Sequence, residues 1–91
     1  MGSGPELGAP VTVIIRANNQ HINGKVDTWN QRRGNDGFLR ASCKIELNDV
    51  IKVFPVDEVD IIFNDNKKRR ALFVKEQGNI IEVKNIDMNA H

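Results

Sequence analysis

The chain has 91 residues with one cysteine, and its 13 Lys and Arg residues nearly balance 12 Asp and Glu residues, for a formal net charge of +1. A domain of this length buries only about 60% of the surface that its unfolded chain exposes, so oligomerisation would add to its stability. The near-neutral charge argues against nucleic-acid binding by bulk charge alone, and no stretch is long and apolar enough to span a bilayer. The lone Cys43 excludes an internal disulfide and favours a reducing compartment, the cytoplasm or the nucleus.

The first ten residues, MGSGPELGAP, are polar, rich in Gly and Pro, and without periodicity. We expect residues 1–10 to be a disordered tail or a segment added for expression, and residues 11–91 to be a single domain. VTVIIR (11–16) alternates with the period of two that is typical of a half-buried strand. ANNQ (17–20) is a turn signal, because Asn tolerates left-handed backbone and bonds to its own main chain.

HINGKVDTW (21–29) resumes β character with Ile22, Val26 and Trp29. Its Asn23-Gly24 pair is open to two interpretations. It could be a type I′ hairpin turn, or Gly24 could lie inside a bent strand where a missing side chain allows close backbone approach. We favour the bent strand, because the Asn18-Asn19 turn already serves the hairpin.

NQRRGNDG (30–37) is predicted to be a polar loop. FLRASCKIEL (38–47) alternates again, and one face of this predicted strand carries Leu39, Ala41, Cys43, Ile45 and Leu47. DVIKVF (49–54) is predicted to be a short strand that ends at Pro55, and VDEVDIIF (56–63) a further strand.

NDNKKRR (64–70) is predicted to be a loop or a hairpin tip. ALFVKE (71–76) and IIEVKNI (80–86), joined by a Gly78-Asn79 turn, make a last hairpin. No segment sustains helical periodicity over twelve residues. The sequence therefore predicts an all-β fold of five or six strands, most simply a small barrel.

Residue types that carry catalysis or bind metals are few and scattered. His21, Cys43 and His91 lack zinc-ligand spacing, and a thiol on the inward side of a strand usually behaves as a small hydrophobe. Asp57, Glu58 and Asp60 could pair as an acid and a base, although a solvated strand edge is the commoner fate of such a trio. We predict a non-enzymatic protein without a cofactor or a metal.

Binding is better supported. Trp29 precedes Arg32 and Arg33, and an aromatic plane beside guanidinium groups suits stacking and phosphate contact with single-stranded nucleic acid. Alternatively, Trp29 caps the barrel core. A second basic cluster consists of Lys67, Lys68, Arg69 and Arg70. These four cations could contact phosphate, form a short nuclear import signal, or keep edge strands apart at a hairpin tip.

Between the two basic segments the chain is acidic. Residues 45–66 hold one Lys against six acids, Glu46, Asp49, Asp57, Glu58, Asp60 and Asp65. Two hypotheses follow. The first is a module that binds RNA or single-stranded nucleic acid through its basic loops. The second is a protein-interaction or assembly subunit that uses strand edges and the acidic segment 46–65.

VTVIIRANNQHINGKVDTWNQRRGND (11–36) resembles the first motif of the Sm-like (LSm) family of small five-stranded barrels, with Gly24 in the bent second strand. ALFVKEQGNIIEV (71–83) is similar to the second motif, although Glu76 stands where the family has Gly. The resemblance implies a homo-oligomeric ring whose loops hold RNA bases. The RNA-facing positions that it implies are Trp29, Arg33, Asn35 and Lys75.

IKVFPVDEVDII (51–62) is also similar to the strand–Pro–strand pattern of SH3-like barrels. Members of that group bind peptides, methylated side chains or DNA. With no Tyr and one Trp in the chain, an aromatic cage for a methylated cation is hard to assemble.

Overall fold

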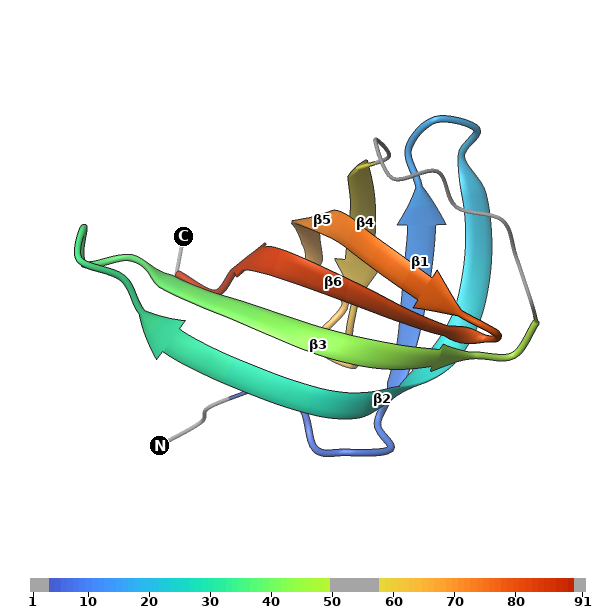
Figure 1. Ribbon diagram of the computed structural model, residues 1–91, viewed down its shortest axis with the longest axis horizontal. Helices are drawn as coiled ribbons and strands as arrows, with labels where there is room; N and C mark the ends of the chain where they lie inside the picture. Colours follow the sequence, from blue (N-terminus) through green and yellow to red (C-terminus); the bar gives the residue numbers. More distant parts are fainter. Residues whose placement is uncertain (1–3, 50–57, 90–91) are drawn as a thin grey trace.

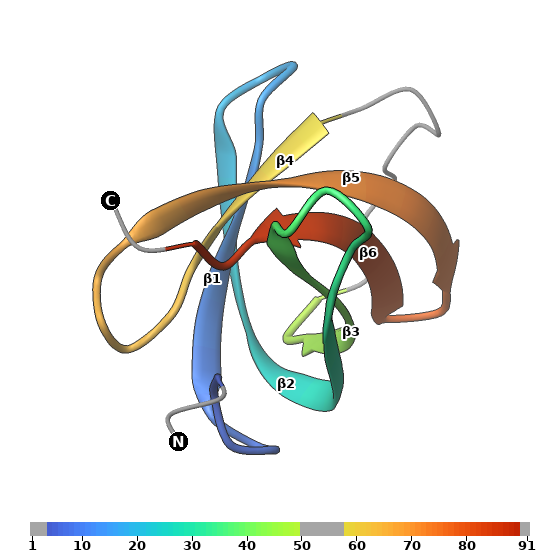
Figure 2. The same cartoon turned by 90° about the vertical axis from the view of Figure 1, so that its left-hand side faces the viewer.

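The computed structural model describes residues 4–49 and 58–89, which form six β-strands and no helix (Figure 1). The strands are β1 Pro10–Ile15, β2 Gln20–Arg33, β3 Leu39–Leu47, β4 Glu58–Ile62, β5 Lys68–Gln77 and β6 Ile80–Asp87. Every adjacent pair is antiparallel, and the order β1-β2-β3-β6-β5-β4 closes into a barrel (Figure 2). The predicted small all-β barrel is confirmed. Within these residues there is no helix that could cross a membrane.

The core follows from the alternation of the strands. In β3 every second residue is buried apart from half-buried Leu39, which confirms the predicted inward face. Cys43 is 3% exposed and lies among aliphatic side chains from neighbouring strands. Burial raises the pKa of its thiol to about 12, so Cys43 behaves as a small hydrophobe at neutral pH.

Gly24 lies inside β2, paired with Val11 of β1 on one side and Leu47 of β3 on the other. A Cβ atom at this position would stand 2.5 Å from the carbonyl oxygen of Glu46. The bent-strand interpretation is therefore confirmed. The turn between β1 and β2 contains Asn19, whose φ is 57°.

The long connections of the barrel bring distant segments together. β3 pairs on one side with its hairpin partner β2 and on the other with β6, which follows it in the chain only after β4 and β5. β4 pairs with both β1 and β5 and thereby closes the barrel. β4 falls within the strand predicted for residues 56–63. The strand predicted for residues 49–54 lies largely outside the described residues.

Two predicted loops are shorter than the sequence suggested. β2 continues through Arg33, so residues 30–33 are strand and only residues 34–38 connect β2 to β3. β5 begins at Lys68, so three of the four consecutive cations are strand residues. In both places the backbone pairs with a neighbouring strand, and this hydrogen bonding does not depend on side-chain polarity.

Residues 4–9 lie against the barrel. The amide of Gly8 donates to the carbonyl of Val26, and the amide of Val26 donates to the carbonyl of Ala9. Gly4 lies beside the indole of Trp29, where a Cβ atom on the glycine would stand 2.5 Å from Nε1. These residues, expected to belong to a tail, thus continue the contact between β1 and β2.

Candidate nucleic-acid interface

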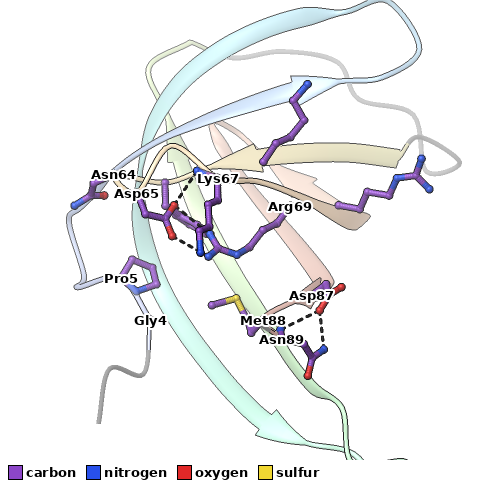
Figure 3. A pocket seen from close by; sticks show the side chains of 12 residues that line it. Gly4, Pro5, Asn64, Asp65, Lys67, Arg69, Asp87, Met88 and Asn89 are labelled. Carbon is purple, nitrogen blue, oxygen red and sulfur yellow. Dashed lines mark hydrogen bonds and ion pairs between the residues drawn. The ribbon is translucent and has the colours of Figure 1, made fainter. Parts of the chain in front are cut away.

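A groove of about 1050 Å³ opens between the β4–β5 turn and the end of β6 (Figure 3). Residues 67–70 form one side, and residues 87–89 form the other. The rest of the lining consists of Gly4, Pro5 and residues 63–65. All four consecutive cations of the sequence therefore lie at one groove.

The groove exists because β5 and β6 separate. Their pairing runs from Gln77↔Ile80 to Leu72↔Lys84 and stops there. Beyond this point residues 68–71 of β5 follow β4, whereas residues 86 and 87 of β6 follow β3. Asn85, at the point of divergence, has a φ of 59°. A break in the β5–β6 ladder thus opens the barrel wall beside the basic run.

Arg69 is bound within the protein. Its guanidinium donates to both carboxylate oxygens of Asp65, at 2.8 and 3.3 Å, and lies 5.6 Å from the centroid of the Phe63 ring. Asp65 also accepts a hydrogen bond of 3.0 Å from the amide of Lys67. The hydrogen bonds from Arg69 and Lys67 hold the pKa of Asp65 below its usual range. With its side chain only 16% exposed, Arg69 shapes the groove and is poorly placed to bind a ligand.

Lys67, Lys68 and Arg70 are exposed, and none of them forms an ion pair with another described residue. The groove is lined by four cations and by two carboxylates, those of Asp65 and Asp87, which leaves a formal charge of +2. Like charges held close together repel one another, so an anion in the groove would be stabilised by them.

Trp29, in β2, lies next to two residues of the groove lining, Phe63 and Gly4. Its ring meets Phe63 edge to face, with centroids 5.4 Å apart and an interplanar angle of 83°. Its indole Nε1 donates to Gln31 at 3.0 Å. The ring is half-buried and packs against the core, which is the position that the capping interpretation describes. Its use as a stacking partner stays a prediction.

Arg32, Arg33 and Asn35 belong to the β2–β3 hairpin, which reaches beyond the other strands (Figure 1). Arg33 donates to the carbonyl of Gly37 at 2.7 Å, and exposed Asn35 lies in the turn. The carboxylate of Asp36 binds Arg40 through two hydrogen bonds of 2.8 and 3.1 Å. Together with a bond from the Phe38 amide, they lower the pKa of Asp36 to about 2.

Lys75 lies on the far part of β5, away from the groove lining. Its ammonium is 3.8 Å from Glu82, and it lines a smaller depression of about 400 Å³ together with Asp27 and Lys44. The structure therefore places the predicted cations and Asn35 at three separate locations, namely the groove, the hairpin and this depression, whereas Trp29 packs against the core beside Phe63.

Sequence reasoning missed Phe38, which is 53% exposed at the base of the hairpin turn. The guanidinium carbon of Arg40 lies 5.7 Å from the centroid of its ring. Its exposure could have been found from the sequence, because alternation with inward-facing Leu39 points Phe38 away from the core and because it follows a turn rich in Gly, Asn and Asp.

The acidic residues of segment 46–65 are spread over several elements, and several of them lie against cations. Glu46 pairs with Lys25 at 3.1 Å. Arg16 lies 3.8 Å from Glu58 and 3.9 Å from Asp60. Asp57 lies outside the described residues. Among residues 4–49 and 58–89, no group of three or more His, Cys, Asp or Glu side chains is arranged to hold a metal ion.

No protein-family model matches the chain, and no curated protein or solved structure is significantly similar to it. The closed six-strand barrel is consistent with an Sm-like or an SH3-like domain at the level of architecture.

Proposed function

We propose that the protein binds RNA or another single-stranded nucleic acid, with the phosphate backbone held in the groove between β5 and β6. The observation that carries the proposal is the gathering of residues 67–70 at one groove of about 1050 Å³ with a formal charge of +2. Lys67 in the turn, together with Lys68 and Arg70 on the outward face of β5 at the rim of the groove, would contact phosphates, whereas Arg69 would hold the wall in shape through Asp65 and Phe63.

A single strand suits this site better than a duplex does. The groove lies between two strands of a small barrel whose largest dimension is 34 Å, and its lining mixes cations with the apolar side chains of Phe63 and Met88. Single-stranded binders combine a positively charged groove with apolar and aromatic contacts to bases. The Sm-like resemblance points to the same ligand class, although the positions that it implies for RNA, Trp29, Arg33, Asn35 and Lys75, lie outside the groove lining.

The assembly hypothesis has less support. It needs an anionic face, and Glu46, Glu58 and Asp65 each lie within 4 Å of a cation of the same chain. The nucleic-acid hypothesis instead uses three exposed cations that have no such partner among the described residues.

The test replaces Lys67, Lys68 and Arg70 together with Ser and leaves Arg69 in place. Binding of a fluorescein-labelled single-stranded RNA is measured by anisotropy at several salt concentrations. We expect the dissociation constant to rise roughly tenfold or more at low salt, and the salt slope to shrink by about 2, because each phosphate contact contributes about −0.7.

The matched control replaces Lys25, Lys44 and Lys84 with Ser, which removes the same charge from strands β2, β3 and β6 without touching the groove lining. Equal weakening by both triple variants would mean that binding is diffuse, and the groove assignment would fail. Absence of salt-sensitive binding by the wild-type protein at tens of micromolar, a range typical of non-specific complexes, would reject the nucleic-acid function.

A further inference from the structure

We propose that Phe38 stacks on a base of the bound strand and that the outer face of the β2–β3 hairpin is the second contact surface for the same nucleic acid. This inference rests on the proposed function of the groove, and it adds to that function an aromatic residue and a surface.

The first support is the composition of the hairpin face. Arg32 of β2 is the cross-strand partner of Arg40 of β3, and directly opposed side chains share a face of the ribbon. Phe38 precedes Arg40 by two residues, and its ring lies beside the Arg40 guanidinium. One face therefore presents the Phe38 ring, the Arg40 guanidinium that Asp36 holds against this ring, and the Arg32 guanidinium, which forms no ion pair with another described residue. An aromatic ring beside an available cation is the combination that binds bases and phosphates.

The second support is that the turn is held in one conformation. Asp36 binds the Arg40 side chain and the Phe38 amide, and Arg33 binds the carbonyl of Gly37. A site already ordered before binding loses less conformational entropy when its ligand arrives. Arg32 and Arg40 are like charges directly opposed across the ribbon. The carboxylates of Asp36 and Asp87 both act on Arg40, whereas Arg32 forms no ion pair with another described residue, so Arg32 is the cation of this face that is open to an anionic partner.

The third support is continuity with the groove. Asn89 lines the groove, and its side chain accepts from the Leu39 amide at 2.9 Å and donates to the Leu39 carbonyl at 3.3 Å. The Met88 amide donates to the same carbonyl. Asp87, also in the lining, is the cross-strand partner of Arg40. One wall of the groove is thus joined to the base of the hairpin, and a strand leaving the groove there reaches Arg40 and Phe38.

Phe38 is also the best placed of the aromatic side chains. Phe63 and Phe73 are buried, and Trp29 is half-buried against Phe63 and Gly4. Among the described residues Phe38 is the one exposed aromatic ring. A base stacked on it would gain contact area without any rearrangement of the core.

The test compares Phe38→Ala, Phe38→Leu and Phe38→Trp with a matched surface variant, Leu72→Ala, which trims a side chain that is 38% exposed on β5. Anisotropy with the same single-stranded RNA gives each dissociation constant. We expect Phe38→Ala and Phe38→Leu to raise it roughly 5- to 150-fold, Phe38→Trp to keep it near the wild-type value, and Leu72→Ala to leave it unchanged, because stacking needs a π face.

A second readout locates the base directly. The RNA carries one 5-iodouridine, the wild-type complex is irradiated with long-wavelength ultraviolet light, and the cross-linked peptide is sequenced by mass spectrometry. Cross-linking at Phe38 supports the inference, whereas cross-linking at Trp29 would transfer the stacking role to that residue and overturn it.

The outcomes separate this inference from the function on which it rests. If Phe38→Ala binds like the wild type while the triple Ser variant of the groove is weakened, the hairpin surface is rejected and the groove stands. If Phe38→Trp binds as weakly as Phe38→Ala, stacking is rejected. If the wild-type protein does not bind the RNA, both proposals are rejected.

Discussion

At the scale of single residues, charge partners decide what each cation can do. Arg69 and Lys68 are neighbours in the sequence, yet alternation along β5 places them on opposite faces of the strand. Arg69 is held by Asp65 and Phe63, and Lys68 is exposed without an ion-pair partner among the described residues. The four cations that look equivalent in the sequence therefore divide into one that shapes the groove and three that can meet a ligand.

The Asp65–Arg69 pair makes the stability of the groove wall dependent on pH. The pKa of Asp65 is lower in the folded protein than its ordinary value of about 3.9. The stability that the ionised Asp65 carboxylate adds to the fold is therefore fully present above about pH 4, and it is lost as the pH falls through the folded-state pKa.

We expect Asp65→Asn to lower the free energy of unfolding by up to about 1 kcal/mol at pH 7, since the carboxylate is half exposed, and by progressively less in acid. Urea denaturation at several pH values measures the difference. Asp27→Asn, at an exposed position without an ion pair among the described residues, is the control for loss of a charge. A difference that grows on acidification would contradict this account.

At the scale of elements, strand pairing overrides local composition. Residues 30–33 and 68–70 are polar or charged and look like loops, but β3 and β4 supply backbone hydrogen bonds that extend β2 and β5 through them. The alternation of residues 39–47 predicted β3 and its buried Cys43 correctly, because a strand with one face in the core leaves a period of two in the sequence. Partners supplied by distant segments leave no such local pattern.

Gly24 shows where a single atom controls an element. A Cβ atom there would stand 2.5 Å from the Glu46 carbonyl oxygen, which is backbone and cannot swing aside. We expect Gly24→Ala to destabilise the fold by about 1–3 kcal/mol, through displacement of β2 from β3. Thermal and urea unfolding measure the effect, with Lys25→Ala as the control at the next position of the strand. Equal stability of the two variants would show that β2 and β3 can separate there without cost.

At the scale of the whole molecule, the site depends on a connection that the sequence could not reveal. The groove opens because β6 leaves its hairpin partner β5 to follow β3, and β3 and β6 are far apart in the chain. The cations were identified from the sequence, whereas their groove was not. Phe38 was missed because its significance depends on Arg32, Arg40 and residues 87–89, which the fold brings near it.

Cys43 offers a measurement of the barrel as one cooperative unit. It lies in β3 between β2 and β6, is 3% exposed, and has a thiol pKa raised by burial to about 12. Thiol reagents react with the thiolate. In the native protein at pH 8 the Cys43 sulfur is buried and almost entirely protonated, so it is neither accessible nor reactive. We expect labelling with a chromogenic disulfide at that pH to be at least about a thousandfold slower in buffer than in denaturant, if the barrel opens only on global unfolding.

The raised pKa of the Cys43 thiol also determines how the stability of the fold responds to alkaline pH. Because the folded-state pKa of Cys43 exceeds its unfolded value of about 8.5, the stabilisation is complete below that pH and is lost as the pH rises toward about 12. Cys43→Ala should therefore remove the part of the alkaline loss of stability that is due to this thiol, while the part due to other groups remains.

In the labelling experiment, a rate of Cys43 modification in buffer close to that in denaturant would mean that β3 opens locally. The groove wall, which is tied to β3 through Leu39 and Asn89, would then open with it.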